Sequence, residues 1–123
     1  MLTLRKVVGV RRINQLSRAN RWNIGLIKSF YMRGVEDIFN PLNLREARRT
    51  CPEQLWAVTR RKLDQLNAAV SVDSLRIPPG NRLEALHGDR AGQHSIRIND
   101  QFRVCFVWTT EGPERVEITD YHP

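Results

Sequence analysis

The last residues of the chain include three side chains that could do acid–base chemistry. Asp120, Tyr121 and His122 place a carboxylate, a phenol and an imidazole next to one another. With a cation close by, such groups suit RNA cleavage by transesterification. A base takes the proton of the ribose 2′-OH, the cation stabilises the phosphorane, and an acid protonates the leaving 5′-oxygen. This route needs no metal ion. The alternative is a polar chain end that takes no part in chemistry.

Two arginines of a predicted hairpin could supply the cation. A three-residue loop, Asn99-Asp100-Gln101, would put the apolar residues of both strands on one face, whereas a two-residue loop would set Ile96 opposite Arg103. The longer loop therefore predicts Arg97 and Arg103 side by side on the other face, together with Ser95 and Cys105. Adjacent like charges repel unless an anion lies between them. That anion could be a phosphate, or a carboxylate such as Glu84 or Glu117, and the sequence leaves both open.

The final strand would bring the chain end to the same face. Alternation along residues 116–121 predicts Val116 and Ile118 in the core and Glu117, Thr119 and Tyr121 on the face shared with Arg103. His122 would follow at the open end of the sheet, with Asp120 beside it. The candidate catalytic groups and the candidate phosphate ligands are thus expected to lie together.

The segments that position these residues predict an α+β fold, in which two N-terminal helices pack on a small antiparallel sheet. Residues 26–31 read as a first strand, and the spacing of Val35, Ile38 and Phe39 predicts a short helix that Pro41 ends. A capping box of Thr50 and Glu53 predicts the start of a second helix that fades near residue 69. After the break at residues 78–80, four strands are expected, at 82–86, 94–98, 102–108 and 115–121.

Basic side chains gather around the second predicted helix. They are candidates for contact with RNA backbone, although a solvated helix face would look the same. The residues concerned are Arg45, Arg48, Arg49, Arg60 and Arg61.

The composition fits one small domain, because the chain has 123 residues and 41% hydrophobic content. Residues 1–25 contain six basic and no acidic residues, so they account for +6 of the formal charge of +7. We expect this basic leader to lie outside the fold, as a misplaced start, a disordered arm or a transit peptide. Two cysteines without metal-ligand spacing argue against a disulfide framework and a zinc site. No apolar run is long enough to span a membrane, so we expect a cytoplasmic protein without membrane contact.

A long stretch of the sequence resembles a known family. Residues 83–103, LEALHGDRAGQHSIRINDQFR, are similar to the central signature of HigB-type toxins, in the RelE/ParE superfamily. The ending VEITDYH at 116–122 and the opening LIKSF at 26–30 resemble the same family's terminus and start. The resemblance therefore implies a RelE/ParE-like toxin domain over residues 26–123.

The resemblance implies a toxin of a type II toxin–antitoxin system. Such toxins enter the A site of the 30S ribosomal subunit and cleave mRNA there as metal-independent endoribonucleases, and so inhibit translation. The implied partners are the ribosome, mRNA and a HigA-type helix-turn-helix antitoxin, through which the complex would bind operator DNA. No cofactor and no metal are implied.

Site residues follow from the resemblance position by position. Arg103 stands at the family's phosphate-stabilising arginine, and Asp120, Tyr121 and His122 stand at its catalytic cluster. We expect Asp120 or His122 to act as base, Arg103 to bind the scissile phosphate with Arg97 nearby, and Tyr121 to stack on a base. His87 stands where many members have lysine and would act as acid. Glu84 replaces a histidine of some members and adds negative charge, so the sequence predicts a weak enzyme.

Two other functions compete with this hypothesis. A ParE-like toxin of the same fold would inhibit DNA gyrase by binding and would cleave nothing. The arginine and acid–base cluster argues against that function, because a pure inhibitor does not need it. A non-enzymatic RNA-binding module, with the basic leader as its arm, is the second alternative.

Overall fold

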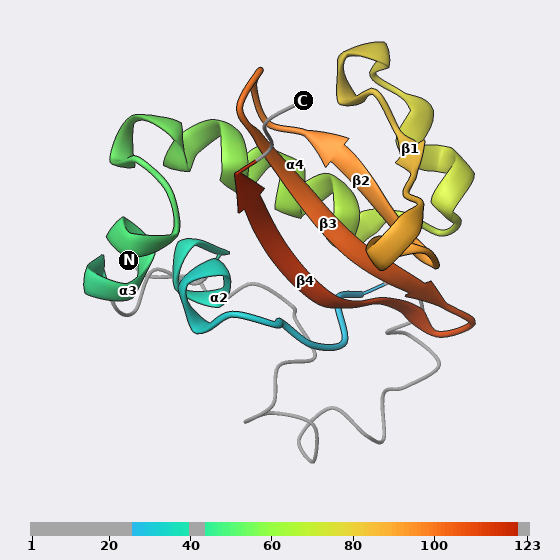
Figure 1. The fold of residues 1–123 in the computed structure, drawn as a ribbon, viewed down its shortest axis with the longest axis horizontal. Helices are drawn as coiled ribbons and strands as arrows, with labels where there is room; N and C mark the ends of the chain where they lie inside the picture. The colour runs from blue at the N-terminus through green and yellow to red at the C-terminus, as the bar shows by residue number, and fades with distance from the viewer. Residues whose placement is uncertain (1–25, 40–43, 121–123) are drawn as a thin grey trace.

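The computed structural model describes residues 26–39 and 44–120. Within these ranges the helices lie mainly in the first half of the chain and the strands in the second (Figure 1). The helices are α2 (Arg33–Phe39), α3 (Leu44–Thr50) and α4 (Trp56–Ala68), with 3-10 turns at Glu53–Leu55, Val72–Arg76 (η4), Pro79–Asn81 (η5) and Gly88–Arg90 (η6). The strands are β1 (Glu84–Ala85), β2 (Gln93–Arg97), β3 (Phe102–Thr109) and β4 (Gly112–Asp120). They form one antiparallel sheet in the order β1-β2-β3-β4, which confirms the α+β prediction.

The hairpin between β2 and β3 has the predicted odd loop. Arg97 pairs with Arg103 and Ser95 with Cys105, while the amide of Ile98 donates to the carbonyl of Phe102 at 2.9 Å. The side-chain oxygen of Asn99 accepts from the amides of residues 101 and 102, an arrangement that asparagine favours in turns. Alternation of apolar side chains over a single core is therefore sufficient to set this register.

The core lies between the sheet and the helices. α4 crosses behind the sheet in Figure 1, and α2 packs beside it and against β4. The buried cluster combines side chains of the helices with the inward residues of the strands, among them Phe39, Leu63, Leu66, Ile96, Val104, Phe106, Val116 and Ile118. Burying a side chain of this size contributes roughly 1.5–3 kcal/mol. One face of the sheet is thus buried in the core.

An irregularity in β4 sets the direction of its side chains near the β3–β4 turn. The pairing slips between Cys105 and Val107 of β3, so that β4 contains one extra residue there. Arg115 lies in this bulge with a φ of 55°, a left-handed conformation that is uncommon for a residue with a side chain. A bulge of this kind re-aims the side chain that it contains.

The predicted first strand is only partly confirmed. Residues 26–31 run parallel to β4, but they form an isolated bridge between Phe30 and Val116 in place of a regular strand. Val116 exchanges backbone hydrogen bonds with Ser29 and Tyr31 at 3.1 and 2.9 Å. Because Val116 directly follows the bulged Arg115, the parallel pairing between residues 26–31 and β4 does not extend beyond this bridge.

The predicted capping box is wrong. Thr50 ends α3, and its hydroxyl donates to the carbonyl of Glu46 in the preceding turn at 2.9 Å. α4 begins only at Trp56, without a side-chain cap, after the short turn at 53–55. A threonine hydroxyl can bond the carbonyl four residues back, and this local bond competes with capping. The helix at 44–50 was not predicted, since its arginine-rich sequence has no clear apolar period.

The predictions for the basic leader, 1–25, and for the helix stop at Pro41 concern segments outside the described residues. Within the described ranges, the helices are too short or too polar to cross a membrane.

Candidate functional site

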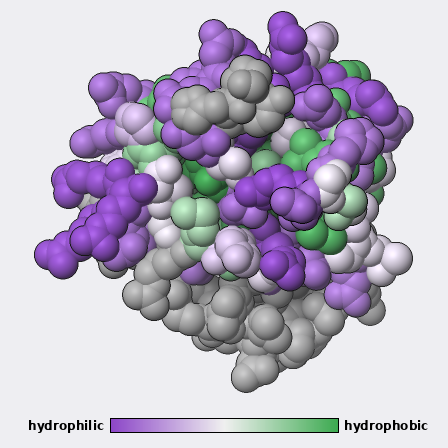
Figure 2. All heavy atoms as spheres, viewed as in Figure 1, coloured by the Kyte–Doolittle hydropathy of each residue, from purple (hydrophilic) through white to green (hydrophobic). Residues whose placement is uncertain are grey.

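The site is built on the sheet face that turns away from α4, here called the open face. It carries Arg97 and Arg103 from the central hairpin and Thr119 and Glu117 from β4, since Arg103 pairs with Thr119 and Cys105 with Glu117. The alternation predicted for these strands is therefore confirmed. Figure 2 looks onto this side of the molecule, where hydrophilic side chains cover much of the surface and smaller apolar areas lie between them.

Each of the two paired arginines has its own carboxylate. Arg103 Nη1 lies 3.4 Å from Glu84 Oε1, and Arg97 forms an ion pair with Asp100 within the hairpin loop. The hydrogen bond from Arg97 lowers the pKa of the Asp100 carboxyl below its ordinary value. Glu84, one of the carboxylates named from the sequence, therefore lies beside Arg103. In the first pair the arginine is the more buried partner, with 15% of its side chain exposed against 52% for Glu84.

A hollow of about 220 Å³ borders Arg103, and its other lining residues are Arg82, Leu83 and Glu84. Sequence reasoning missed Arg82, which ends η5 with a φ of 46° and also helps to lower the pKa of Asp100. Its position after the Pro-Pro-Gly break gives no hint of this placement, because it depends on how the turn packs beside the sheet. We call Arg82, Arg97 and Arg103 the arginine end of the open face.

Lys62 of α4 extends the positive charge near this end. Its ammonium group donates to Asn81 Oδ1 at 2.6 Å. Burial lowers the pKa of Lys62, and the positive charges of Arg61 and Arg97 lower it further. The predicted basic helix residue Arg61 and the hairpin residue Arg97 therefore contribute to one electropositive region.

Of the C-terminal candidates, the structure describes Asp120, and strand alternation places its side chain on the face opposite to Arg103, because Asp120 pairs with the core residue Phe102. Asp120 is the last residue of β4, pairs with Phe102 and accepts from Gln101 Nε2 at 3.2 Å. Its carboxylate is exposed at the strand end, next to Thr119, which faces Arg103. Tyr121 and His122 lie outside the described residues.

His87 is exposed at the start of η6. Its Cα lies three residues from that of Glu84, so the two are at most about 11 Å apart. Glu84 in turn contacts Arg103. His87 therefore lies near the arginine end.

The basic helix residues divide into two groups. Arg45, Arg48 and Arg49 of α3 are exposed, and the latter two lie 3.9 Å from Glu53 and Glu46. Exposed pairs of this length contribute little to stability, so these side chains remain available at the surface. On α4, Arg61 is also exposed. The neighbouring Arg60 is half-buried, and its Nε donates to the carbonyl of Ile38 at 2.9 Å, which ties α4 to the end of α2.

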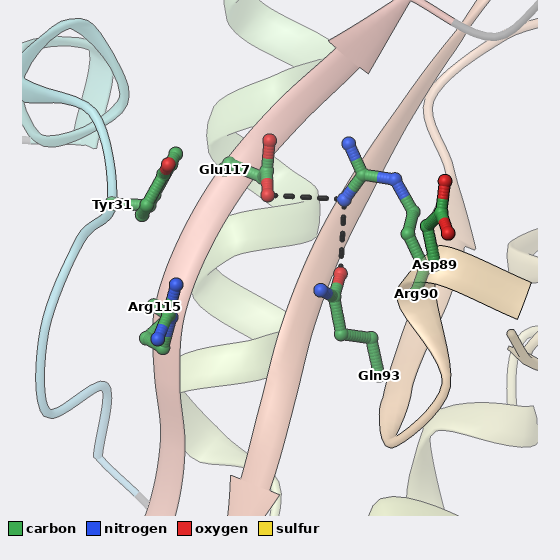
Figure 3. A pocket seen from close by; sticks show the side chains of 6 residues that line it. All are labelled: Tyr31, Asp89, Arg90, Gln93, Arg115 and Glu117. Atoms are coloured by element: carbon green, nitrogen blue, oxygen red, sulfur yellow. Dashed lines mark hydrogen bonds and ion pairs between the residues drawn. The ribbon is translucent and has the colours of Figure 1, made fainter.

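The other end of the open face holds a second cluster that the sequence did not predict. Arg90 of η6 reaches across β3, and its Nη1 lies 3.1 Å from Glu117 Oε2 and 3.0 Å from Gln93 Oε1 (Figure 3). The hydrogen bond to Glu117 raises the pKa of Arg90. A hollow of about 400 Å³ lies here, lined by Tyr31, Asp89, Arg90, Gln93, Arg115 and Glu117. We call Tyr31, Arg90, Arg115 and Glu117 the tyrosine end.

The thiol of Cys105 lies beneath the open face between the two ends. Burial raises its pKa, while a hydrogen bond with Thr119 and the positive charges of Arg90 and Arg103 lower it to a smaller extent. Among the described residues, no three His, Cys, Asp or Glu side chains form a group that could hold a metal ion.

Comparisons with known proteins identify a family that this chain resembles. Residues 28–122 match the family of HigB-like toxins, described as the RelE-like toxin of the type II toxin–antitoxin system HigB. The chain is 47% identical over 60 residues to Toxin HigB-1 of Vibrio cholerae serotype O1, a match that covers 49% of this chain and 63% of that protein. It is 38% identical over 63 residues to an uncharacterized protein of Haemophilus influenzae, covering 51% of this chain and 60% of that protein.

The chain thus spans less than two thirds of the length of either relative. The family match, by contrast, extends over most of this chain and over every described strand. It includes the arginine end, the tyrosine end and the helices that cover the opposite face of the sheet. The resemblance noted in the sequence is confirmed, and the chain belongs to the HigB-like family of RelE-like toxins of type II toxin–antitoxin systems.

Proposed function

We propose that this toxin inhibits translation by cutting mRNA in the ribosomal A site, as a metal-independent endoribonuclease of the cytoplasm. The observation that carries the proposal is the arginine end, where Arg97 and Arg103 lie side by side next to a hollow and beside the end of β4. Guanidinium groups on an open face suit a phosphate, which each can bind through two hydrogen bonds.

Arg103 is assigned the role of stabilising the phosphorane. Its guanidinium is largely shielded from water, which strengthens its interaction with charge that develops in the transition state. An incoming phosphate would replace the exposed carboxylate of Glu84 at this group. Arg97, with its ion pair to the fully exposed Asp100, would contact the same or the adjacent phosphate.

The remaining roles follow the family resemblance. Asp120 or His122 would take the proton of the 2′-OH, His87 would protonate the leaving oxygen, and Tyr121 would stack on a nucleotide base. Glu84 places negative charge beside Arg103, so we expect a slow enzyme. The imidazole at position 87 can donate a proton, whereas the lysine that many family members have at this position would be a permanent phosphate ligand.

The exposed basic side chains of α3 and α4 would hold the toxin on ribosomal RNA. This contact would be salt-sensitive and independent of sequence, because it is made to phosphates. The residues assigned to it are Arg45, Arg48, Arg49, Arg60 and Arg61. Arg60 already donates through Nε to a backbone carbonyl, so only its terminal amino groups could serve. The further proposed partner is a HigA-type helix-turn-helix antitoxin, through which the complex would bind operator DNA.

The test is primer extension on a reporter mRNA in a purified translation system supplied with the full chain. A double variant, Arg103→Ala with His122→Gln, removes the proposed phosphate ligand and one proposed base. Arg76→Ala is the matched control, because Arg76 is an exposed arginine that pairs only with Asp73 of its own turn. We expect ribosome-dependent cleavage within A-site codons for the wild type and the control, and none for the double variant.

Intact mRNA at doses that still stop growth would overturn the proposal. In that case inhibition of DNA gyrase, as by a ParE-like toxin, would be measured by a supercoiling assay, although the family match gives that function no support. Cleavage that persists in the double variant would instead reject the assigned residues.

A further inference from the structure

The tyrosine end contains an exposed aromatic ring that is held next to a cation. Tyr31 precedes α2, and its side chain is 61% exposed. The guanidinium carbon of Arg115 lies 5.3 Å from the centre of the Tyr31 ring. Figure 3 shows both side chains on the same side of the hollow, one from the N-terminal segment and one from β4. The cation thus lies over one face of the exposed ring.

The backbone holds Arg115 in this position at a cost. Its φ of 55° lies in the left-handed region, which is unfavourable for a residue with a Cβ. The amide of Arg115 donates to Ser29 Oγ at 2.9 Å, which ties the bulge to the segment that carries Tyr31. Such a conformation persists where neighbouring contacts hold the backbone. Here it places the guanidinium of Arg115 over the ring of Tyr31.

The opposite wall of the hollow is polar and fixed. Arg90 donates to both Glu117 and Gln93, so these three side chains hold one another in place, and Asp89 lies behind them (Figure 3). The wall offers an amide and carboxylates, which can bond the edge of a base. The volume of about 400 Å³ lies within the range typical of small-ligand pockets.

We infer that the tyrosine end is a second RNA subsite, which binds one nucleotide next to the cleaved phosphodiester. The base would stack on Tyr31, its edge would meet the amide of Gln93, and Arg115 would bind its phosphate. Stacking on an aromatic side chain suits single-stranded RNA, since every base has a π-face. Five of the six lining side chains are polar or charged, which favours a nucleotide over an apolar peptide segment.

The two ends are close enough to share one RNA strand. Glu117 lies two residues before Thr119 on β4, a separation of about 7 Å along the strand. Thr119 is the residue that pairs with Arg103, and its hydroxyl lies 3.5 Å from Glu117 Oε1. RNA bound at Arg103 could therefore continue over the open face into the hollow. The assignment of this nucleotide as a neighbour of the cut rests on the proposed function, whereas nucleotide binding itself does not.

The test is a titration of the full chain with AMP, UMP and inorganic phosphate, followed by amide NMR. We expect both nucleotides to shift the signals of Tyr31, Gln93 and Arg115. Tyr31→Ala should weaken nucleotide binding about 5- to 150-fold, the range of one base-stacking contact, and Tyr31→Phe should restore it. Arg115→Gly removes the guanidinium while suiting the positive φ, so the fold is preserved and binding should fall.

Two further variants separate this inference from the nuclease proposal. Arg103→Ala should bind nucleotides at the tyrosine end within about twofold of the wild type, and Arg76→Ala should match the wild type. Absence of nucleotide shifts around Tyr31 would overturn the inference, as would binding of phosphate equal to that of UMP and unaffected by Tyr31→Ala. Nucleotide binding that survives both Tyr31→Ala and Arg115→Gly, while these changes release a co-purified antitoxin, would overturn it in favour of a protein interface.

Discussion

The two ends of the open face both consist of arginines paired with carboxylates, but the pairs are buried in opposite senses. At the arginine end the guanidinium of Arg103 is shielded and its partner Glu84 is exposed. At the tyrosine end the carboxylate of Glu117 is shielded, with 16% of its side chain exposed, and Arg90 is the more exposed partner at 37%. The buried partner of an ion pair needs a counter-charge, whereas the exposed partner can return to water.

This difference suggests separate roles for the two pairs. Glu84 can leave Arg103 and be replaced by a phosphate, so that pair is suited to open when RNA binds. If Arg90 moved away, the shielded carboxylate of Glu117 would lose its counter-charge. This pair is therefore suited to hold η6 against β4. The predictions below test this distinction.

The largest expected effect is on catalysis at the arginine end. Arg103→Ala should lower the single-turnover rate of mRNA cleavage about 10²- to 10³-fold, as loss of a transition-state ligand does. Arg97→Ala should lower it less than about tenfold, because Arg97 is more exposed and already paired with Asp100. The rates would be measured on programmed ribosomes, with Arg76→Ala as control. Equal losses for Arg97 and Arg103 would mean that the two arginines act as one unit.

The second effect is on stability at the tyrosine end. Arg90→Ala should lower the free energy of unfolding by about 1–2 kcal/mol, because it leaves Glu117 buried without its partner. For a domain of this size, each kcal/mol corresponds to roughly 4–8 °C in Tm. Urea unfolding of Arg90→Ala, Glu117→Ala and the double variant would give the coupling energy. A double variant as unstable as the sum of the single ones would show that the pair contributes no coupling.

The third expected effect is a gain of activity at the arginine end. Glu84→Gln should raise cleavage at subsaturating mRNA about three- to tenfold, because it removes a charge whose interaction across 4 Å of water is worth about 1 kcal/mol. The gain should shrink as salt is added. Glu53→Gln is the matched control, since Glu53 is an exposed carboxylate beside Arg48. An unchanged rate in Glu84→Gln would indicate that Glu84 does not compete with RNA.

The smallest effect concerns Cys105, between the two ends. Burial raises the pKa of its thiol above the ordinary value of 9.0, and burial does the same for Cys51. The folded protein therefore keeps these protons where the unfolded chain has released them. Their contribution to stability is complete below pH 9 and is lost as the pH rises through the higher folded values. The urea midpoint should fall as the pH rises above 9, and less so in Cys105→Val. A midpoint that does not depend on pH in this window would contradict the burial of the thiols.

Several features of the site were predictable because they depend on neighbouring residues in the sequence. The register that sets Arg97 opposite Arg103 follows from alternation in two strands joined by a short loop. The placement of Glu117 and Thr119 on the same face follows from alternation in one strand. The capping box failed for a related reason, since the Thr50 hydroxyl found a nearer partner in the preceding turn.

The features that were missed depend on contacts between distant segments. Arg90 and Glu117 are 27 residues apart, and Tyr31 meets Arg115 from the far end of the domain. Arg82 reaches the hollow beside Arg103 only because the turn at η5 packs beside β2. No local pattern marks these residues, because a turn arginine or an exposed tyrosine looks the same wherever the chain carries it.

The sequence by itself determined the fold class, the register of the β2–β3 hairpin and the family, because periodicity and a long ordered resemblance are both properties of consecutive residues. The tertiary structure alone decided which carboxylate each arginine meets and which partner of each pair is buried. It also decided that a second hollow lies beside the first. The reason is that pairing and burial depend on the three-dimensional packing of elements far apart in the chain, and burial decides whether a charge stays bound or is free to exchange.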